Sequence, residues 1–454
     1  MIVWIFGGGL AAVCAAFFAM WAYRNFVGVL EGEEKKKFGL LALTFFSIIG
    51  VYTMMKMFKD AFFIELVGVR YIPAAKLVSP IIFTLVLLLY NKIIPIFRKH
   101  KLFIIVCSFY AAIYAGMGYL YSHPSILTIS PYVAWIPGKV LGWAGYVLIE
   151  SFGGLVVNAL FWAFVASTTT TVSAKRGYPL VFLMAQLGNL AGASIVSRFA
   201  VVLDFHGLFY LASIIIFFIP TIVETLVKTV PKKLMQSDEG KRHKKQNPGI
   251  LEGLKLILGN GYVAGMLVVA TFYEIIGTIL DYQFKSAASA AYSGSALASF
   301  MGTYGMVLGT MTMIFALVGT SFVIRFVGVC KGILLYPVLL SVVVVLGLFY
   351  PSLSTFFVAM LVVKSMSYTL NNPVKELLYL PTSDDVKFKS KSFIDGIGGK
   401  TFKAIGSGFN IVFGSSILIG GAVACFGVLG IWIFVGIAMG KRYDVLISNH
   451  EIVG

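Results

Sequence analysis

Apolar stretches of about 20 residues recur along the whole chain and constrain its fold more than any other feature. A helix needs roughly 20 predominantly apolar residues to cross a bilayer. Each such stretch predicts one spanning helix, because helices satisfy their own backbone hydrogen bonds in lipid. We therefore predict an all-α membrane protein. Twelve or thirteen stretches qualify, at residues 3–23, 38–56, 72–96, 102–121, 140–166, 178–202, 206–228, 261–284, 297–325, 331–349, 353–371, 400–418 and 420–440.

The composition argues against an ordinary soluble fold. Hydrophobic residues make up 59% of the 454 residues and charged residues only 12%, whereas a soluble domain carries about 25% charged residues. The net charge of +17 would suggest nucleic-acid binding in a soluble protein. Here most Lys and Arg lie in short loops, which indicates membrane topology and no nucleic-acid partner. The alternative for some of them is a site that binds an anion.

Basic clusters predict the orientation of the chain, because Lys and Arg stay on the cytoplasmic side of a membrane. Counted from the stretch that begins at Phe38, the clusters occupy every second loop, and only residues 57–71 depart partly from this pattern. Loops such as 122–139 and 350–352 contain almost no Lys or Arg. This alternation predicts twelve core helices with the basic clusters on the cytoplasmic side. The clusters are Lys35 to Lys37, Arg98 to Lys101, Lys175 and Arg176, Lys232 to Lys245, Arg325 with Lys331, Lys375 to Lys391, and Lys441 with Arg442.

The longest charged stretch divides the core into two sets of six helices. Two six-helix halves joined by a basic cytoplasmic loop are typical of major-facilitator-type carriers, which bind substrate near the midplane between the halves. The first apolar stretch predicts an extra helix, with a cleaved signal as the alternative. The predicted divisions are residues 1–30 (extra helix), 38–228 (first half), 229–250 (basic loop), 251–440 (second half) and 441–454 (cytoplasmic tail).

Two carboxylates lie inside apolar stretches, where an ionisable group costs about 2.5–3.5 kcal/mol on the insertion scale. Glu150 shares a helix face with Gly154 and Asn158. A place in the transport pathway is one interpretation of this polar stripe, and a structural carboxylate bonded to a neighbouring helix is the other. Glu274 shares a face with Thr271, Thr278 and Asp281. For this stripe the alternative is a solvated helix end.

Four lysines are candidates for binding an anionic substrate. Lys56 and Lys59 stand at the end of an apolar stretch and on one helix face, where snorkelling to the interface is the alternative. Lys364 lies inside 353–371, and Lys375 follows just beyond it. A buried lysine needs a carboxylate or an anionic ligand as its partner. For Lys375, membership of a basic cytoplasmic loop is the alternative.

Other motifs do not indicate catalysis. Gly399-Lys400-Thr401 looks like the end of a phosphate-binding loop, but Ile394 stands where that loop needs its first glycine. The four cysteines lack metal-ligand spacing, so we predict no enzyme, no metal and no cofactor. Gly188 and Gly192, on either side of Asn189, are typical of a helix-packing contact. Asn189 is a further candidate for the transport pathway.

Four segments resemble the plastid and bacterial ATP/ADP translocases, which carry nucleotides. They follow the order of that family across most of 38–440. The third segment differs at Asn372, where the family commonly has Asp, and Glu274 lacks the Trp-Lys that usually follows. The four are FKDAFFIELVG (58–68), LIESFGGLVVNALFWAFVASTTTTVSAKRGYPL (148–180), NNPVKELLYLP (371–381) and DVKFKSKSFIDGIGGK (385–400).

The resemblance implies a twelve-helix nucleotide carrier. Two lysines and two glutamates of the family motifs are associated with transport, and the match places them on Lys59, Glu150, Glu274 and Lys375. We hypothesise that the lysines bind phosphates from opposite halves and pair with the glutamates in the empty carrier. ATP/ADP exchange, proton-driven nucleotide import and uptake of another metabolite remain open, as does a non-transporting scaffold or receptor. A bacterial inner membrane is the expected location, since no Arg- and Ser-rich transit segment precedes the first helix.

Overall fold

The computed structural model describes residue 30 and residues 32–97, 99–123, 139–235, 250–383, 386–414 and 417–453. All of the predicted extra helix at 1–30 except residue 30, and most of the predicted loop at 229–250, therefore lie outside the described residues. The described chain is almost entirely helical, and its β-structure amounts to one isolated bridge between Thr382 and Val453. The all-α prediction is confirmed.

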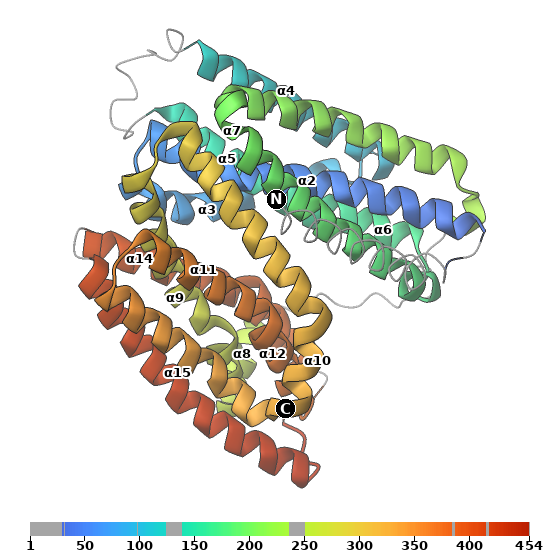
Figure 1. Ribbon diagram of the computed structural model, residues 1–454. Helices are drawn as coiled ribbons and strands as arrows, with labels where there is room; N and C mark the ends of the chain where they lie inside the picture. Colours follow the sequence, from blue (N-terminus) through green and yellow to red (C-terminus); the bar gives the residue numbers. More distant parts are fainter. Residues whose placement is uncertain are drawn as a thin grey trace, which may run out of the picture.

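The first half is a bundle of long helices (Figure 1). Short 3-10 turns at Val69–Tyr71 (η2) and Lys232–Met235 (η6) accompany them. The helices are α2 (Glu33–Leu66), α3 (Ile72–Ile93), α4 (Lys99–Ser122), α5 (Val140–Phe152), the π-helix η5 (Gly153–Phe161), α6 (Trp162–Thr168) and α7 (Thr171–Thr229).

The second half forms a separate bundle whose long axes diverge from those of the first half (Figure 1). Its helices are α8 (Ile250–Gly259), α9 (Gly261–Ala291), α10 (Gly294–Phe349), α11 (Leu353–Met366), the π-helix η8 (Ser367–Asn371), α12 (Asn372–Leu378), the π-helix η9 (Val386–Ser390), α13 (Lys391–Phe393), the π-helix η10 (Ile394–Gly398), α14 (Gly399–Phe413) and α15 (Ile417–Ser448).

Ten helices of the described chain are long and apolar enough to cross a membrane. One of them, α7, has 59 residues and bends at Asp204, where φ is 52°. At a rise of about 1.5 Å per residue, α7 is roughly twice as long as a bilayer is thick, so it contains two crossings. The count therefore agrees roughly with the predicted twelve core helices.

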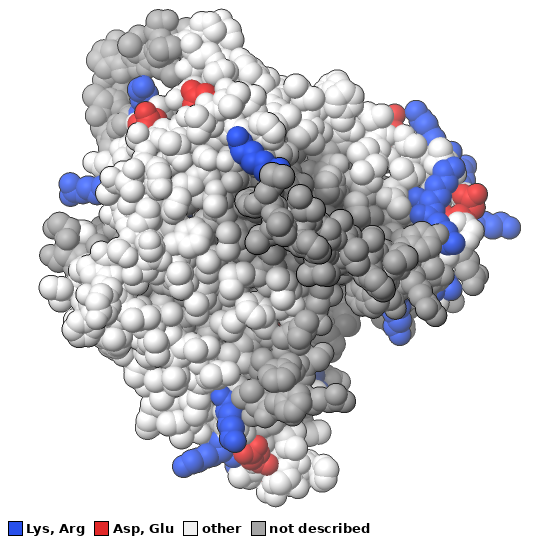
Figure 2. Space-filling model, in the orientation of Figure 1, with Lys and Arg blue, Asp and Glu red and all other residues white. Residues whose placement is uncertain are grey.

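Most of the face in Figure 2 is uncharged, and Lys and Arg gather mainly at its right and lower edges.

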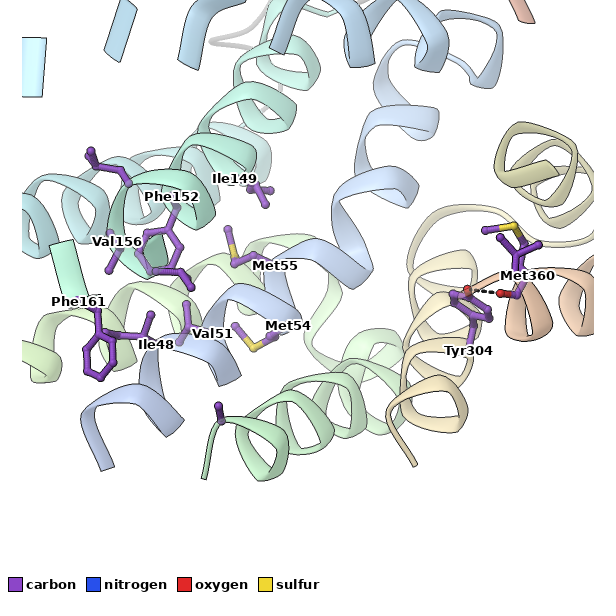
Figure 3. Packing of buried hydrophobic residues seen from close by; sticks show 14 of the residues in the cluster. Ile48, Val51, Met54, Met55, Ile149, Phe152, Val156, Phe161, Tyr304 and Met360 are labelled. Atoms are coloured by element: carbon purple, nitrogen blue, oxygen red, sulfur yellow. Dashed lines mark hydrogen bonds between the residues drawn. The ribbon is translucent and has the colours of Figure 1, made fainter. Parts of the chain in front are cut away.

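The core of the first half is centred on α2. Figure 3 shows Ile48, Val51 and Met55 of α2 pointing toward Phe152 and Val156 of α5 and η5. These side chains are buried, with exposures between 0 and 1%. In the second half, Tyr304 of α10 donates a hydrogen bond of 3.4 Å to the carbonyl oxygen of Met360 on α11 (Figure 3).

Glycines bring α2 and α7 into backbone contact, as the sequence predicted for Gly188 and Gly192. A Cβ atom at Gly188 would lie 2.5 Å from the carbonyl oxygen of Phe46, and one at Gly192 would lie 2.9 Å from the backbone nitrogen of Met54 and closer still to the carbonyl oxygen of Gly50. The close approach fixes the position of α2 in the first half, so the lysines that α2 carries are held at a defined depth.

We expect Gly192→Val to destabilise the protein by about 2–4 kcal/mol, because the new side chain forces α2 and α7 apart. In detergent, the melting temperature should fall by roughly 5 °C. Gly427→Val is the matched control, since Gly427 has no neighbouring atom within 4 Å of its Cβ position. Equal melting temperatures for the two variants would contradict the close contact.

The two halves meet through α2, α3 and α7 on one side and α9, α10 and α14 on the other. The Ser299 hydroxyl on α10 donates a hydrogen bond of 2.6 Å to the carbonyl oxygen of Ser197 on α7. The hydroxyls of Ser197 and Thr303 are 2.7 Å apart. A Cβ atom at Gly302 would lie 2.8 Å from the Cα atom of Ser197. Small and hydroxylated residues thus allow the halves to touch along α7 and α10.

Candidate functional site

Lys59 and Glu150 form an ion pair inside the first half. The Lys59 ammonium donates a hydrogen bond to Oε1 of Glu150 and lies 3.9 Å from the ring centroid of Tyr146. Lys59 is 4% exposed, whereas the side chain of Glu150 is 35% exposed. The sequence placed Lys59 at a helix exit, but α2 continues to Leu66. A buried lysine whose hydrogen-bonded partner is a partly exposed carboxylate can exchange that partner for an anionic ligand.

A local distortion follows Glu150 along the chain. The helix changes to a π-helix at Gly153, and π-segments are frequent at functional sites. A Cβ atom at Gly154 would lie within 3.0 Å of the ring of Phe83 on α3, so glycine is needed for this contact. Asn158 lies in the π-segment, is exposed, and donates a hydrogen bond of 3.4 Å to the carbonyl oxygen of Gly153.

Glu274 belongs to the second half, near the middle of α9. It is 8% exposed, and its Oε1 accepts a hydrogen bond of 2.7 Å from the Tyr273 hydroxyl. The Lys403 ammonium on α14 is 3.3 Å from the same oxygen. Thr271 and Thr278 are buried nearby on the same helix. Nothing in the sequence singles out Lys403, because it lies within 400–418, a stretch whose apolar character predicts a spanning helix.

Lys375 lies apart from the other candidates, in the last turn of α12. Its ammonium is 2.9 Å from Oδ1 of Asp395 in η10. Two further ion pairs lie nearby: Lys391 pairs with Glu376, and the Lys389 ammonium is 3.1 Å from a carboxylate oxygen of Glu252. The structure thus includes Lys375 in a cluster of basic loop residues and does not bring it together with Lys59.

Three other lysines have no ion-pair partner within the described part of the chain: Lys56, Lys364 and Lys400. Lys56 on α2 is exposed and lies 5.9 Å from the ring centroid of Tyr52. Its neighbour Met57 packs against the second half, where a Cβ atom at Gly305 of α10 would clash with the Met57 sulfur. Lys400 on α14 is exposed and lies 5.8 Å from the ring centroid of Phe83 in the first half. Both cations therefore stand at the junction of the halves.

The last candidate from the sequence, Asn189, has a structural partner. Its Oδ1 accepts a hydrogen bond of 2.9 Å from the Thr53 hydroxyl of α2, which supports the packing of α2 on α7. Among the described residues no group of three His, Cys, Asp or Glu could hold a metal ion. The chemistry at the junction is that of lysines and carboxylates, which suits electrostatic binding of an anion.

Comparison with known proteins finds transport proteins that match most of the chain. The family model described as TLC ATP/ADP transporter matches residues 18–359. ADP,ATP carrier protein 4 of Rickettsia felis is 24% identical over 444 residues, which cover 85% of this chain and 86% of that protein. ADP,ATP carrier protein 1 of Rickettsia prowazekii is 24% identical over 486 residues, which cover 94% of this chain and 97% of that protein.

Solved structures share the two-bundle fold. A bacterial homologue of the iron transporter ferroportin, in an inward-facing state, aligns with a TM-score of 0.60 and 11% identity, covering 88% of this chain and 98% of that chain. A POT family transporter in complex with 5-aminolevulinic acid aligns with a TM-score of 0.51 and 13% identity, covering 91% of this chain and 96% of that chain. The predicted major-facilitator-like fold is confirmed. The match to the family model covers well over half of the sequence, and the chain is thus an integral membrane protein that belongs to the TLC ATP/ADP transporter family.

Proposed function

We propose that this protein exchanges ATP for ADP across the bacterial inner membrane by alternating access between its two halves. Membership of the TLC family supports a transporter, and the Rickettsia relatives are ADP,ATP carriers by name. The observation that carries the proposal is the pair of exposed lysines at the junction, Lys56 from the first half and Lys400 from the second, without ion-pair partners among the described residues.

The charge balance at the junction suits a nucleotide. Lys56 and Lys59 come from α2, and Lys400 and Lys403 come from α14, whereas Glu150 and Glu274 supply two opposing charges. Burying a polyphosphate without cationic partners is prohibitive. Four lysines against two carboxylates leave a surplus of positive charge for the phosphates.

Pairing of lysines with glutamates explains how the site can exist without substrate. In the empty carrier Glu150 holds Lys59, and Glu274 holds Lys403. Phosphate oxygens replace these carboxylates as partners when substrate binds. Lys375, which pairs with Asp395, would bind phosphates on their way to or from the site.

The test is uptake of labelled ATP into intact cells that express the protein, followed by a chase with unlabelled ADP. We expect rapid uptake and rapid efflux of label on the chase, because an exchanger returns one nucleotide for each one it takes. Cells carrying the empty vector are the control. Uptake without efflux on the chase would contradict exchange, and the absence of uptake by a correctly inserted protein would contradict ATP as the substrate.

A further inference from the structure

A second set of buried charges joins the two halves outside the proposed nucleotide site. The Asp281 carboxylate on α9 is 2.5 Å from the Lys76 ammonium on α3 and 2.7 Å from the Lys285 ammonium on its own helix. Lys285 is also 2.8 Å from Asp60 on α2. Two basic and two acidic side chains therefore alternate across the boundary between the halves.

These four side chains, Asp60, Lys76, Asp281 and Lys285, are named here the ion-pair cluster. Their exposures are low: 8% for Lys285, 13% for Asp60, 19% for Asp281 and 21% for Lys76. Charges withdrawn from water in this way need each other, because a charge left without its partner in such a place is strongly unfavourable. Moving α9 away from α2 and α3 would break the ion pairs between the halves and leave these charges exposed or without those partners.

The cluster lies toward one end of the molecule. Asp60 precedes the end of α2 at Leu66 by roughly two turns, and Lys76 lies just inside the start of α3 at Ile72. Lys285 stands within two turns of the end of α9 at Ala291. The turn between α9 and α10 has no Lys or Arg, and the loop between α2 and α3 has only Arg70. The basic cluster at the start of α2, Lys35 to Lys37, belongs to the opposite end.

The cluster is connected to the proposed nucleotide site through neighbouring residues of α2. Lys59 bonds Glu150, and its ammonium lies 3.9 Å from Oδ1 of Asp60. Asp60 is the residue that bonds Lys285 of the second half. A polyanion bound at Lys59 would repel the carboxylate of Asp60 and attract the ammonium of Lys285, and so weaken the bond between the halves.

We propose that Asp60, Lys76, Asp281 and Lys285 form a lock that keeps the empty carrier closed at the end poor in basic loops, and that phosphate bound at Lys59 releases it. The second part rests on the proposed function, whereas the first does not. These residues are positioning residues, because they act on the arrangement of the halves and not on the substrate. Such a lock makes transport an obligatory exchange, since only the loaded carrier can open at this end.

The test measures access to the junction with a thiol reagent, without any nucleotide. Tyr368 of η8, which is 62% exposed and lies near Lys56, is replaced by cysteine after the four native cysteines are changed to serine. A membrane-impermeant maleimide is added to right-side-out membrane vesicles that have been washed free of nucleotide. With the lock intact, labelling of Tyr368→Cys should be slow; adding Asp281→Asn should speed it at least tenfold.

A double variant covers the case in which Asp281→Asn does not fold. Asp60→Asn with Lys285→Gln removes one bond between the halves and leaves the net charge of the cluster unchanged, so the same acceleration is expected. The matched control is Glu224→Gln with Lys228→Gln, an exposed pair at 3.2 Å within α7 that joins no halves. Labelling in both lock variants at the rate of the control would overturn the lock.

The labelling result is independent of the substrate. Faster labelling in a protein that fails to exchange nucleotides would keep the lock and refute the proposed function. Unchanged labelling in a protein that exchanges ATP for ADP would do the reverse. For the release step, saturating ADP loaded inside the vesicles reaches the lock-intact protein from its open, cytoplasmic side. It should speed labelling several-fold, and Lys59→Gln should abolish that effect; no effect of ADP on an active exchanger would refute release.

Discussion

Replacing Lys59 with glutamine should lower the ratio of maximal transport rate to KM for nucleotide exchange by about 30- to 1,000-fold. This factor corresponds to about 2–4 kcal/mol. Lys59 is the buried cation of the site, and glutamine removes its charge while keeping much of its length. The substitution also leaves Glu150 without its ion-pair partner. Initial rates of labelled ATP uptake over a range of ATP concentrations measure the effect.

A second variant separates binding from folding in this experiment. Lys59→Gln with Glu150→Gln restores the charge balance of the pair, so we expect protein levels and melting temperature close to those of the unmodified protein. Exchange should nevertheless remain low, because the phosphates still lack their cation. Lys92→Gln, at an exposed position near the end of α3, is the control for loss of a lysine. Recovery of exchange in the double variant would show that Lys59 acts only by balancing Glu150.

Glu274→Gln should produce the opposite change in affinity. Glu274 competes with phosphate for the Lys403 ammonium, which lies 3.3 Å from its Oε1. Without that competitor the nucleotide binds more tightly, and we expect KM to fall by about tenfold, or about 1.4 kcal/mol. The maximal rate should fall by a similar factor, because tighter binding of the substrate raises the barrier to its release.

The split between KM and maximal rate is the informative result for Glu274. A residue needed only for folding would lower the amount of active protein and leave KM unchanged. Glu224→Gln on the exposed surface of α7 serves as the control, with no change expected in either constant. An increase in KM for Glu274→Gln would contradict competition between this carboxylate and the phosphates.

The sequence was sufficient to predict the membrane fold because the apolar stretches report directly on lipid contact. Helix ends were harder to predict. The stretch 38–56 ended where charged residues begin, yet α2 runs from Glu33 to Leu66. Lys59 and Asp60 are tolerated in its interior because their partners come from α5 and α9. A hydropathy pattern treats each charge alone, so it cannot reveal a partner that lies distant in the sequence.

Because ion-pair partners are distant in the sequence, only some site residues could be predicted. The sequence predicted that each lysine would pair with a glutamate, and Lys59 does pair with Glu150. Glu274 pairs with Lys403 instead of Lys375, and Lys375 pairs with Asp395. Lys403 stands near a helix start rich in small residues, where a lysine gives no distinct pattern. Only the packing of α14 against α9 brings it to Glu274.

The cluster between the halves shows a further limit. Asp281 and Lys285 are spaced four residues apart, which is ordinary for an ion pair on one helix. Nothing in that spacing indicates Lys76 or Asp60 as additional partners. The helix α9 is far from α2 and α3 in the chain, and only tertiary packing joins them.

The most direct measurement of the central claim uses the purified protein in liposomes. One set of liposomes is loaded with ADP and the other with buffer, and both receive labelled ATP outside. If the protein exchanges ATP for ADP, uptake of ATP will be rapid into the ADP-loaded liposomes only, with one ADP released for each ATP taken up. Equal uptake into both sets, or no uptake into either by correctly inserted protein, would contradict nucleotide exchange.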